Sequence, residues 1–365
     1  MAGPLSTAGP CHGQRGRGRP AAARRHQPAG MSASRDTLRA VRPTLKSGLL
    51  AVWRDRDTVQ IGIDPRRAVA LTGMGRAAVV IGLLDGSRDR AQVIAAARDQ
   101  GIPAPITDRI LMLLAGAGAL DDQPAAMLGS LPQPMRRRLT AELATASLAH
   151  RDGDGGARTL ARRRAARVLV SGGGRIGTSI AEVLSAAGVT ALDIVPAGAQ
   201  AGHGRPSSAA ARALSPGQLP LPDLAILVGR QAPELTDWLM RARVAHLAAS
   251  AGEAIGVVGP LVRPGQTACL RCLDFIRSER DPAWPLILAQ LAIRQADPPA
   301  CDAALAAAVA AQAAAQAVAF VDRAPLAAAA ENGTQELVLP GWQWRRRSWP
   351  AHRACSCGGA RSAGP

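Results

Sequence analysis

Residues 49–72 alternate between apolar and polar positions in three short runs, LLAVWR, TVQIGI and AVALT, separated by DRD and DPR. Alternation with a period of two around aspartate-containing turns predicts a small antiparallel sheet of three strands. Three segments with apolar residues spaced three and four apart follow, namely GRAAVVIGLLDG, RDRAQVIAAARDQ and ITDRILMLLAGAGAL, and each predicts a helix. Strands followed by a short helical cluster predict a winged-helix-like α+β domain over residues 36–125.

The pattern changes after this domain. Residues 126–165 contain one helical stretch and then HRDGDGGARTLARRR, which has no apolar period, so we predict a linker. From Arg167 the pattern alternates between strand and helix, through ARVLVSGGGRIGTSIAEVLSAAGVTALDIV, PDLAILVG, ELTDWLMRARV and VAHLAAS. This alternation predicts an α/β fold, with a Rossmann-like domain over residues 166–340 whose parallel sheet carries helices on its faces.

A glycine turn joins the first strand of this domain to its helix. Gly172, Gly174 and Gly177 form G-x-G-x-x-G, in which the first glycine allows the turn, the second admits a phosphate and the third lets the helix close on the strand. Asp193 closes the second strand, where a carboxylate can meet a ribose hydroxyl. The pattern predicts nucleotide binding by these four residues. The same turn can also serve only to pack helix on strand, and no proton donor or acceptor for an NAD-dependent oxidoreductase is recognisable.

Four of the six cysteines come as two close pairs. Cys269 and Cys272 form C-x-x-C, and Cys355 and Cys357 form C-x-C. The N-terminus has arginines but no apolar signal-peptide segment, so we expect a cytoplasmic protein, in which clustered thiols favour a metal over disulfides. Four thiolates predict a structural Zn²⁺ site that ties a tail over residues 341–365 to the preceding domain, with His352 as a substitute for one thiol.

Cys301 stands beside Asp302, the predicted N-cap of a helix over residues 303–321. A helix N-terminus can lower the pKa of a thiol and make it a nucleophile, so Cys301 is a candidate catalytic residue. The alternative is a small buried side chain at a cap. The helix is uncharged and almost long enough to span a bilayer, but alanine is weakly apolar and two glutamines interrupt it. These features favour burial against the sheet and no membrane partner.

Composition changes the meaning of the charge. The formal net charge is +17, yet Lys46 is the only lysine, and arginine, alanine, glycine and proline are abundant, as in a GC-rich coding sequence. Part of the charge lies in residues 1–35, whose arginine-rich start has no apolar period, so we predict a disordered extension there. The chain has no tyrosine and only two phenylalanines. With so few aromatic platforms we expect no nucleic-acid partner.

The order of glycine turn, strands and split cysteine pairs resembles the superfamily of ThiF, MoeB and ubiquitin-activating enzymes. The stretch GPLVRPGQTACLRCLDFIRSERDPAWPLILAQL is similar to the metal-binding and crossover region of its actinobacterial-type members. The resemblance covers roughly residues 166–357. It implies a homodimer that uses ATP and Mg²⁺ to adenylate the C-terminal glycine of a ubiquitin-like or sulfur-carrier protein, with Cys301 as a possible thiol acceptor.

The chain departs from this pattern where the family binds phosphates. Val195 stands where a second acid is expected, and no N-x-x-R follows it. At the end of the third strand LVGRQAPE has Arg230 and Gln231 in place of an aspartate for Mg²⁺, and Lys46 lies outside the domain. Loss of these groups removes most of the electrostatic stabilisation that phosphoryl chemistry needs.

A branch of the superfamily with a degenerate nucleotide site therefore fits better than an active adenylyltransferase, which stays the alternative. The chain resembles proteins associated with azole-forming (TOMM) cyclodehydratases. This resemblance implies that the winged-helix-like domain clamps the leader of a precursor peptide, which adds a strand to the sheet edge, while a separate cyclodehydratase-type enzyme performs the chemistry.

Overall fold

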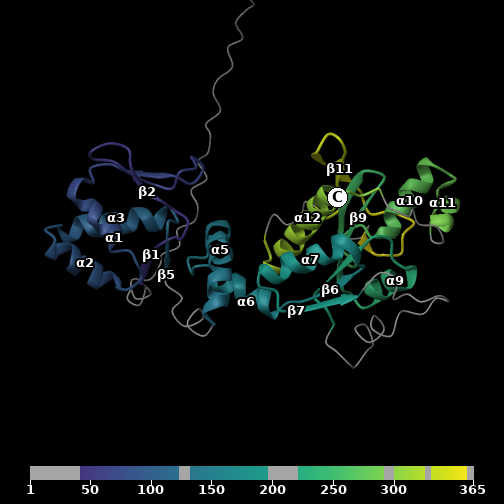
Figure 1. Cartoon of the computed structure of the whole chain (residues 1–365), viewed down its shortest axis with the longest axis horizontal. Coiled ribbons are helices and arrows are strands. Elements are labelled where there is room, and N and C mark those ends of the chain that lie inside the picture. Colours follow the sequence, from purple (N-terminus) through teal and green to yellow (C-terminus); the bar gives the residue numbers. More distant parts are fainter. Residues whose placement is uncertain (1–41, 123–131, 196–220, 292–299, 325–329, 360–365) are drawn as a thin grey trace, which may run out of the picture.

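A computed structural model of the chain is shown in Figure 1. It describes residues 42–122, 132–195, 221–291, 300–324 and 330–359. The predicted extension over residues 1–35 lies outside the described residues. An N-terminal domain, a pair of bridging helices and a C-terminal domain built on a large sheet follow one another along the longest axis (Figure 1).

The N-terminal domain contains the predicted three-stranded sheet and the predicted helices. The antiparallel strands pair in the order β2 (Ala51–Trp53), β3 (Val59–Ile61) and β4 (Val69–Leu71). The helical elements are η2 (Gly75–Ala78), α1 (Val79–Gly82), α2 (Arg90–Asp99) and α3 (Ala104–Gly116). A separate antiparallel pair consists of β1 (Pro43–Leu45) and β5 (Leu120–Asp122). The assignment of this domain as a winged helix stays a prediction.

One apolar core holds the N-terminal domain together. The alternation along β3 turns Val59 and Ile61 inward, where they meet buried side chains of the helices such as Val93 and Leu114. Each such aliphatic side chain contributes on the order of 1.5–3 kcal/mol by leaving water. Helix α2 begins at a capping box, in which the Asp89 carboxylate accepts from the backbone N–H three residues later.

Two helices occupy most of the segment that we predicted as a linker. They are α5 (Gln133–His150) and α6 (Ala157–Ala165). Leu139 and Leu143 of α5 pack against Leu160 of α6. Because this one leucine is the only large apolar residue of α6, its sequence shows no apolar period. At Gly156 the backbone is left-handed, and a Cβ would lie 2.7 Å from the Leu143 carbonyl oxygen, so only glycine fits this turn.

A buried ion pair joins α5 to the N-terminal domain. Lys46 Nζ lies 2.8 Å from Asp121 Oδ1, and the two side chains are 1% and 8% exposed. The same ammonium group donates to the carbonyl oxygen and the hydroxyl of Ser147, at 2.8 and 2.7 Å. The only lysine of the chain therefore connects the end of β1, β5 and α5.

A second buried ion pair joins the bridging helices to the C-terminal domain. The guanidinium of Arg163 donates twice to Asp322, from Nε to Oδ1 at 2.9 Å and from Nη2 to Oδ2 at 2.8 Å. Its Nη1 donates to Glu142 Oε2 at 2.9 Å and to the carbonyl oxygen of Ala187 at 3.1 Å. His150 Nε2 lies 3.3 Å from Asp322 Oδ2. Contacts from α5 and α6 thus converge on one carboxylate.

The C-terminal domain is built on a seven-stranded sheet with the order β12-β11-β10-β9-β8-β6-β7. The parallel strands, all predicted, are β6 (Arg167–Ser171), β7 (Ala191–Val195), β8 (Leu224–Val228) and β9 (Ala245–Gly252). The antiparallel strands, which the sequence did not predict, are β10 (Ile255–Val262), β11 (Gly333–Val338) and β12 (Gln343–Ser348). Strand β12 lies within the predicted zinc-binding tail.

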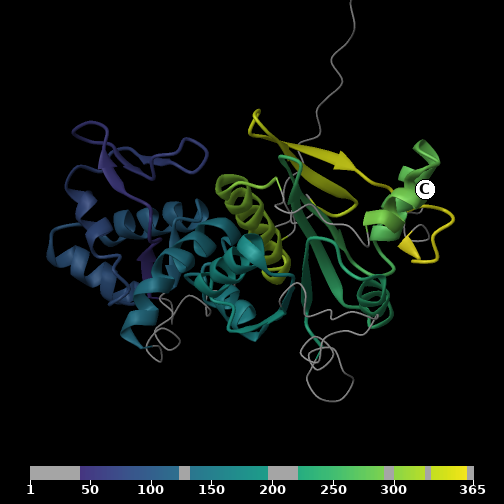
Figure 2. The ribbon, with the colours of Figure 1, turned by 45° about the vertical axis from the view of Figure 1, so that its right-hand side comes forward.

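Helices cover both faces of this sheet (Figures 1 and 2). Helices α7 (Gly174–Ala186) and α12 (Ala303–Val321) lie on one face, and α9 (Pro233–Arg241) lies on the other. Helix α10 (Leu270–Arg280) lies beside α9, and α11 (Trp284–Leu291) lies beside α10. Helix α12, the one described helix long and apolar enough for a membrane span, is half buried against α7 and the sheet. Its predicted packing on the sheet is confirmed.

Candidate functional site

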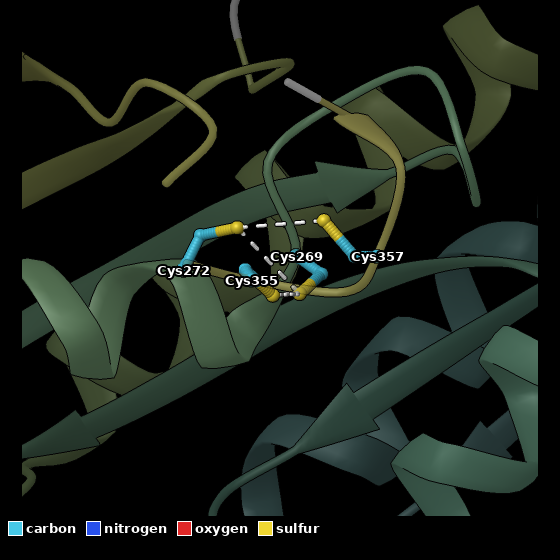
Figure 3. A group of neighbouring side chains, drawn as sticks. All are labelled: Cys269, Cys272, Cys355 and Cys357. Carbon is cyan, nitrogen blue, oxygen red and sulfur yellow. Dashed lines mark hydrogen bonds between the residues drawn. The ribbon is translucent and has the colours of Figure 1, made fainter. Parts of the chain in front are cut away.

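The four predicted metal ligands lie together at the start of α10 (Figure 3). The Sγ atom of Cys269 lies 3.8 Å from that of Cys272 and 3.6 Å from that of Cys355, and Cys272 and Cys357 are 3.5 Å apart. All four sulfurs lie within 4.8 Å of one another. A tetrahedral ion with Zn–S bonds of about 2.3 Å requires sulfurs about 3.8 Å apart. The cluster therefore fits a single ion of this kind.

Local backbone contacts place the two cysteine pairs. Cys269 is the N-cap residue of α10, and its carbonyl oxygen accepts from the N–H of Cys272 at 3.0 Å. The tail approaches so closely that a Cβ on Gly359 would lie 2.4 Å from the carbonyl oxygen of Thr267. The segment before α10 and the last described residue of the tail, Gly359, are thus in backbone contact on one side of the cluster.

His352, the predicted substitute ligand, is engaged elsewhere. Its Nε2 lies 2.7 Å from Glu279 Oε1, and its Nδ1 accepts from the N–H of Ala354 at 3.2 Å. The ring stacks on Phe275 with centroids 5.0 Å apart. The four sulfurs, without this imidazole, are therefore the residues that could hold an ion.

The thiols differ in acidity. A hydrogen bond with Cys269 holds the pKa of Cys272 well below its usual range. Burial raises the pKa of Cys355 to about 11. A metal ion that binds all four as thiolates must therefore displace protons from this cluster.

The three glycines of the turn lie between β6 and α7 and divide into two roles. A Cβ on Gly172 would lie 2.3 Å from the carbonyl oxygen of Val228, and one on Gly177 would lie 2.2 Å from that of Gly172. These two positions are required for packing, whatever the turn binds. A Cβ on Gly174 would meet no described atom within 4 Å. Only this second glycine leaves open space for a ligand.

Asp193 is not brought to the glycine turn. It pairs with Leu169 in the middle of β7, and its Oδ2 lies 3.5 Å from Arg167 Nη2. Leu169 precedes Gly172 by three residues, a distance of about 10 Å along a strand. The residue of β7 that reaches the turn is Val195, whose carbonyl oxygen accepts from the N–H of Gly172 at 2.8 Å.

A neutral amide bridges the carboxyl ends of β6 and β8. Gln231 Nε2 donates to the carbonyl oxygen of Val228 at 2.8 Å and to that of Ser171 at 3.3 Å, and Oε1 accepts from the Ser171 hydroxyl at 2.8 Å. The family resemblance places an aspartate for Mg²⁺ near this position. Sequence reasoning identified the missing carboxylate but not the bridge, which depends on a serine sixty residues away.

Cys301 precedes α12 and shows the opposite of the expected acidity. Burial, and then the neighbouring carboxylate of Asp302, raise the pKa of its thiol, while Arg175 in the first turn of α7 opposes them. Asp302 is the N-cap, as predicted, and its Oδ1 accepts from the N–H of Leu305 at 2.7 Å. The thiol is therefore protonated at neutral pH, which disfavours a nucleophilic role.

The described residues also line a partly open pocket of about 660 Å³ that the sequence did not predict. It lies at the amino ends of β6 and β8, opposite the glycine turn, and its wall includes Arg162, Arg263 and Arg323. Glu331 pairs with Arg263 at 3.3 Å. No periodic signal marks it, because its residues come from five separate segments.

Comparison with known proteins identifies the fold. No family model matches the sequence, and no curated protein matches it. E. coli MccB, solved with AMPCPP and selenomethionine MccA, is similar over 87% of this chain and 99% of its own, at 15% identity and a TM-score of 0.58. The heterocyclase TruD is similar over 88% of this chain and 43% of its own, at 16% identity and a TM-score of 0.60. A heterocyclase in complex with substrate and cofactor is similar over 87% and 40%, at 15% identity and a TM-score of 0.59.

Proposed function

We propose that this chain is a ThiF-like protein with a degenerate nucleotide site, which binds the leader of a precursor peptide and presents it to a separate cyclodehydratase-type enzyme. A structural Zn²⁺ ion on the four cysteines holds the tail, and the protein acts in the cytoplasm as a homodimer. The fold shared with MccB and TruD supports the proposal, as do a structure of MccB with MccA and one of a heterocyclase with its substrate. The observation that carries it is the Gln231 bridge.

The bridge argues against phosphoryl chemistry because it puts a neutral group where a metal carboxylate is needed. Transfer of a nucleotidyl group depends on Mg²⁺ and cationic side chains that neutralise developing charge on the phosphates. The Gln231 amide instead donates hydrogen bonds to carbonyl oxygens at the ends of two strands. Val195 is apolar, and the carboxylate of Asp193 pairs with Arg167. Lys46, the only lysine, is buried in the N-terminal domain.

We expect no exchange of radiolabelled pyrophosphate into ATP when the chain is incubated with Mg²⁺ and with small Gly-terminated proteins encoded beside its gene. The physical reason is the lack of a Mg²⁺ carboxylate at the ends of β6 and β8. Scintillation counting of ATP separates this proposal from the alternative, an active adenylyltransferase. Robust exchange would establish that alternative.

The N-terminal domain offers the surface for the peptide. Within the described residues β2 and β4 are the outer strands of its sheet. The same domain exposes large apolar side chains, including Trp53 on β2, at 55%, and Ile106 and Leu113 on α3, at 45% and 48%. Ile106 and Leu113 are seven residues apart and share one face of the helix. An extended peptide can add a strand to the sheet and place its apolar side chains on this face.

Leu113→Glu is expected to weaken leader binding at least about ten-fold, since it places a charge on the apolar face without disturbing the core. Binding is measured by fluorescence anisotropy with fluorescein-labelled synthetic copies of the short peptides encoded beside the gene. Leu286→Glu, on α11 of the other domain and 65% exposed in the wild type, is the matched control and should bind normally. If no such peptide binds, or if the two variants bind equally well, the proposed peptide site is wrong.

A further inference from the structure

Three arginines surround one buried tryptophan next to the metal centre. Trp349 follows β12, is 1% exposed, and donates from Nε1 to the Thr334 hydroxyl at 2.9 Å. The guanidinium carbons of Arg347, Arg277 and Arg280 lie 4.5, 5.2 and 5.9 Å from its ring centroid. We call these three residues the arginine cluster. Cations over an indole face are stabilised by the ring quadrupole. This attraction offsets part of the electrostatic repulsion among the three guanidinium groups.

The cluster has more positive than negative charge around it. In the described part of the chain its one paired carboxylate is that of Asp274, whose Oδ1 lies 3.8 Å from Arg277 Nη1. That oxygen also accepts from Trp284 Nε1 at 3.1 Å. Burial lowers the pKa of Arg277, and Arg347 and Arg230 add to this, while the carboxylates of Asp274 and Glu336 oppose it. Arg280 and Arg347 are exposed, so both can reach an anion that is supplied from outside.

The geometry favours carboxylates over nucleic acid. A guanidinium that is stacked on an indole keeps its N–H edge free for a bidentate bond to a carboxylate. Base recognition on such a surface requires an open aromatic face, but the Trp349 ring is buried beneath the arginines.

The four clustered cysteines lie on the two segments that carry the arginine cluster. Helix α10 begins at the first cysteine pair and carries Arg277 and Arg280 in its last turn. Trp349 packs against Leu273 and Ile276 of the same helix, and the tail continues from it to the second cysteine pair. Each segment is thus fixed at the cysteines and at the indole, which presents the guanidinium groups in one arrangement.

We propose that the arginine cluster is a docking surface for a carboxylate-rich segment of a partner protein. The surface lies on the C-terminal domain and includes no residue of the proposed leader-peptide site. The outcome of one test therefore does not decide the other.

The test uses a fluorescein-labelled twelve-residue peptide rich in glutamate and its glutamine counterpart, with anisotropy measured on the full chain at low and at physiological salt. We expect the acidic peptide to bind at least about five-fold more tightly. The double variant Arg280→Gln/Arg347→Gln should abolish this preference, and the matched Arg136→Gln/Arg137→Gln variant, which removes two exposed charges from α5, should retain it. The double variant Arg280→Lys/Arg347→Lys should give an intermediate loss, because lysine lacks the bidentate fork.

Equal weakening by the Arg136/Arg137 control would show that binding follows net charge alone and would overturn the proposal. Equal binding of the two peptides would do the same, as would tighter binding of a single-stranded oligonucleotide of matching charge. Circular dichroism verifies that each variant is folded. We expect folding to be retained because both substituted side chains are exposed.

Discussion

Replacing Cys272 with serine is expected to abolish stoichiometric metal binding and to lower the free energy of unfolding by about 4 kcal/mol. The sulfur is fully buried and lies within 4 Å of two of the other three sulfurs, so a serine hydroxyl there would replace a central thiolate ligand. An ion that binds only the folded state stabilises it by about 4 kcal/mol when its free concentration is a thousand times its dissociation constant. Loss of one thiolate removes that contribution.

Metal content by mass spectrometry and thermal unfolding with and without a chelator measure both effects. Cys301→Ser is the matched control, since this thiol lies outside the cluster, and the variant should keep its metal and its unfolding temperature. A wild-type protein that contains no metal after production in zinc-supplemented medium would show that the four sulfurs are not a metal centre. Equal loss in the two variants would do so too.

Asp322→Asn is expected to destabilise the protein by about 3–5 kcal/mol, which is the usual cost of leaving one partner of a buried ion pair alone. The side chains of Arg163 and Asp322 are 6% and 2% exposed, and the carboxylate accepts two hydrogen bonds from the guanidinium. An amide has one acceptor oxygen and no charge. It would leave Arg163 with Glu142 alone, whose side chain is 37% exposed, in place of its buried counter-charge.

Urea unfolding followed by tryptophan fluorescence gives the size of this effect. The matched control is Asp237→Asn, because the Asp237–Arg271 pair is 3.8 Å long with side chains 42% and 63% exposed. An exposed pair contributes about 0–1 kcal/mol. Similar midpoints for the two variants would mean that the buried pair does not hold α6 to α12.

Strands with uninterrupted apolar runs could be predicted from the sequence, whereas β10 could not. Its sequence IGVVGPLV contains Gly256, Gly259 and Pro260, which are typical of turns. The structure supplies the reason for the glycines. A Cβ on Gly256 would lie 2.4 Å from Val309 of α12, and one on Gly259 would lie 2.5 Å from the carbonyl oxygen of Gly333. Both glycines serve packing against segments that are distant in the sequence.

The candidate site divides along similar lines. The cysteine pairs could be predicted because metal ligation requires particular residue types at short spacing, and the turn because its glycines are local. The position of Asp193 depends on strand register, which places it opposite Leu169 rather than at the strand end. The Gln231 bridge depends on Ser171 in a different strand. Neither the register of Asp193 nor the Gln231–Ser171 hydrogen bond produces a periodic pattern in the sequence.

Helices α5 and α6 have a consequence for how a bound peptide would meet its enzyme. Because Lys46 anchors α5 on one side and Arg163 anchors α6 on the other, the spacing of the two domains is set by side-chain contacts and not by the statistics of a flexible tether. A leader peptide bound to the N-terminal domain would then lie at a fixed distance from the C-terminal domain. The effective concentration of the modifiable residues at the enzyme would be governed by the length of the peptide alone.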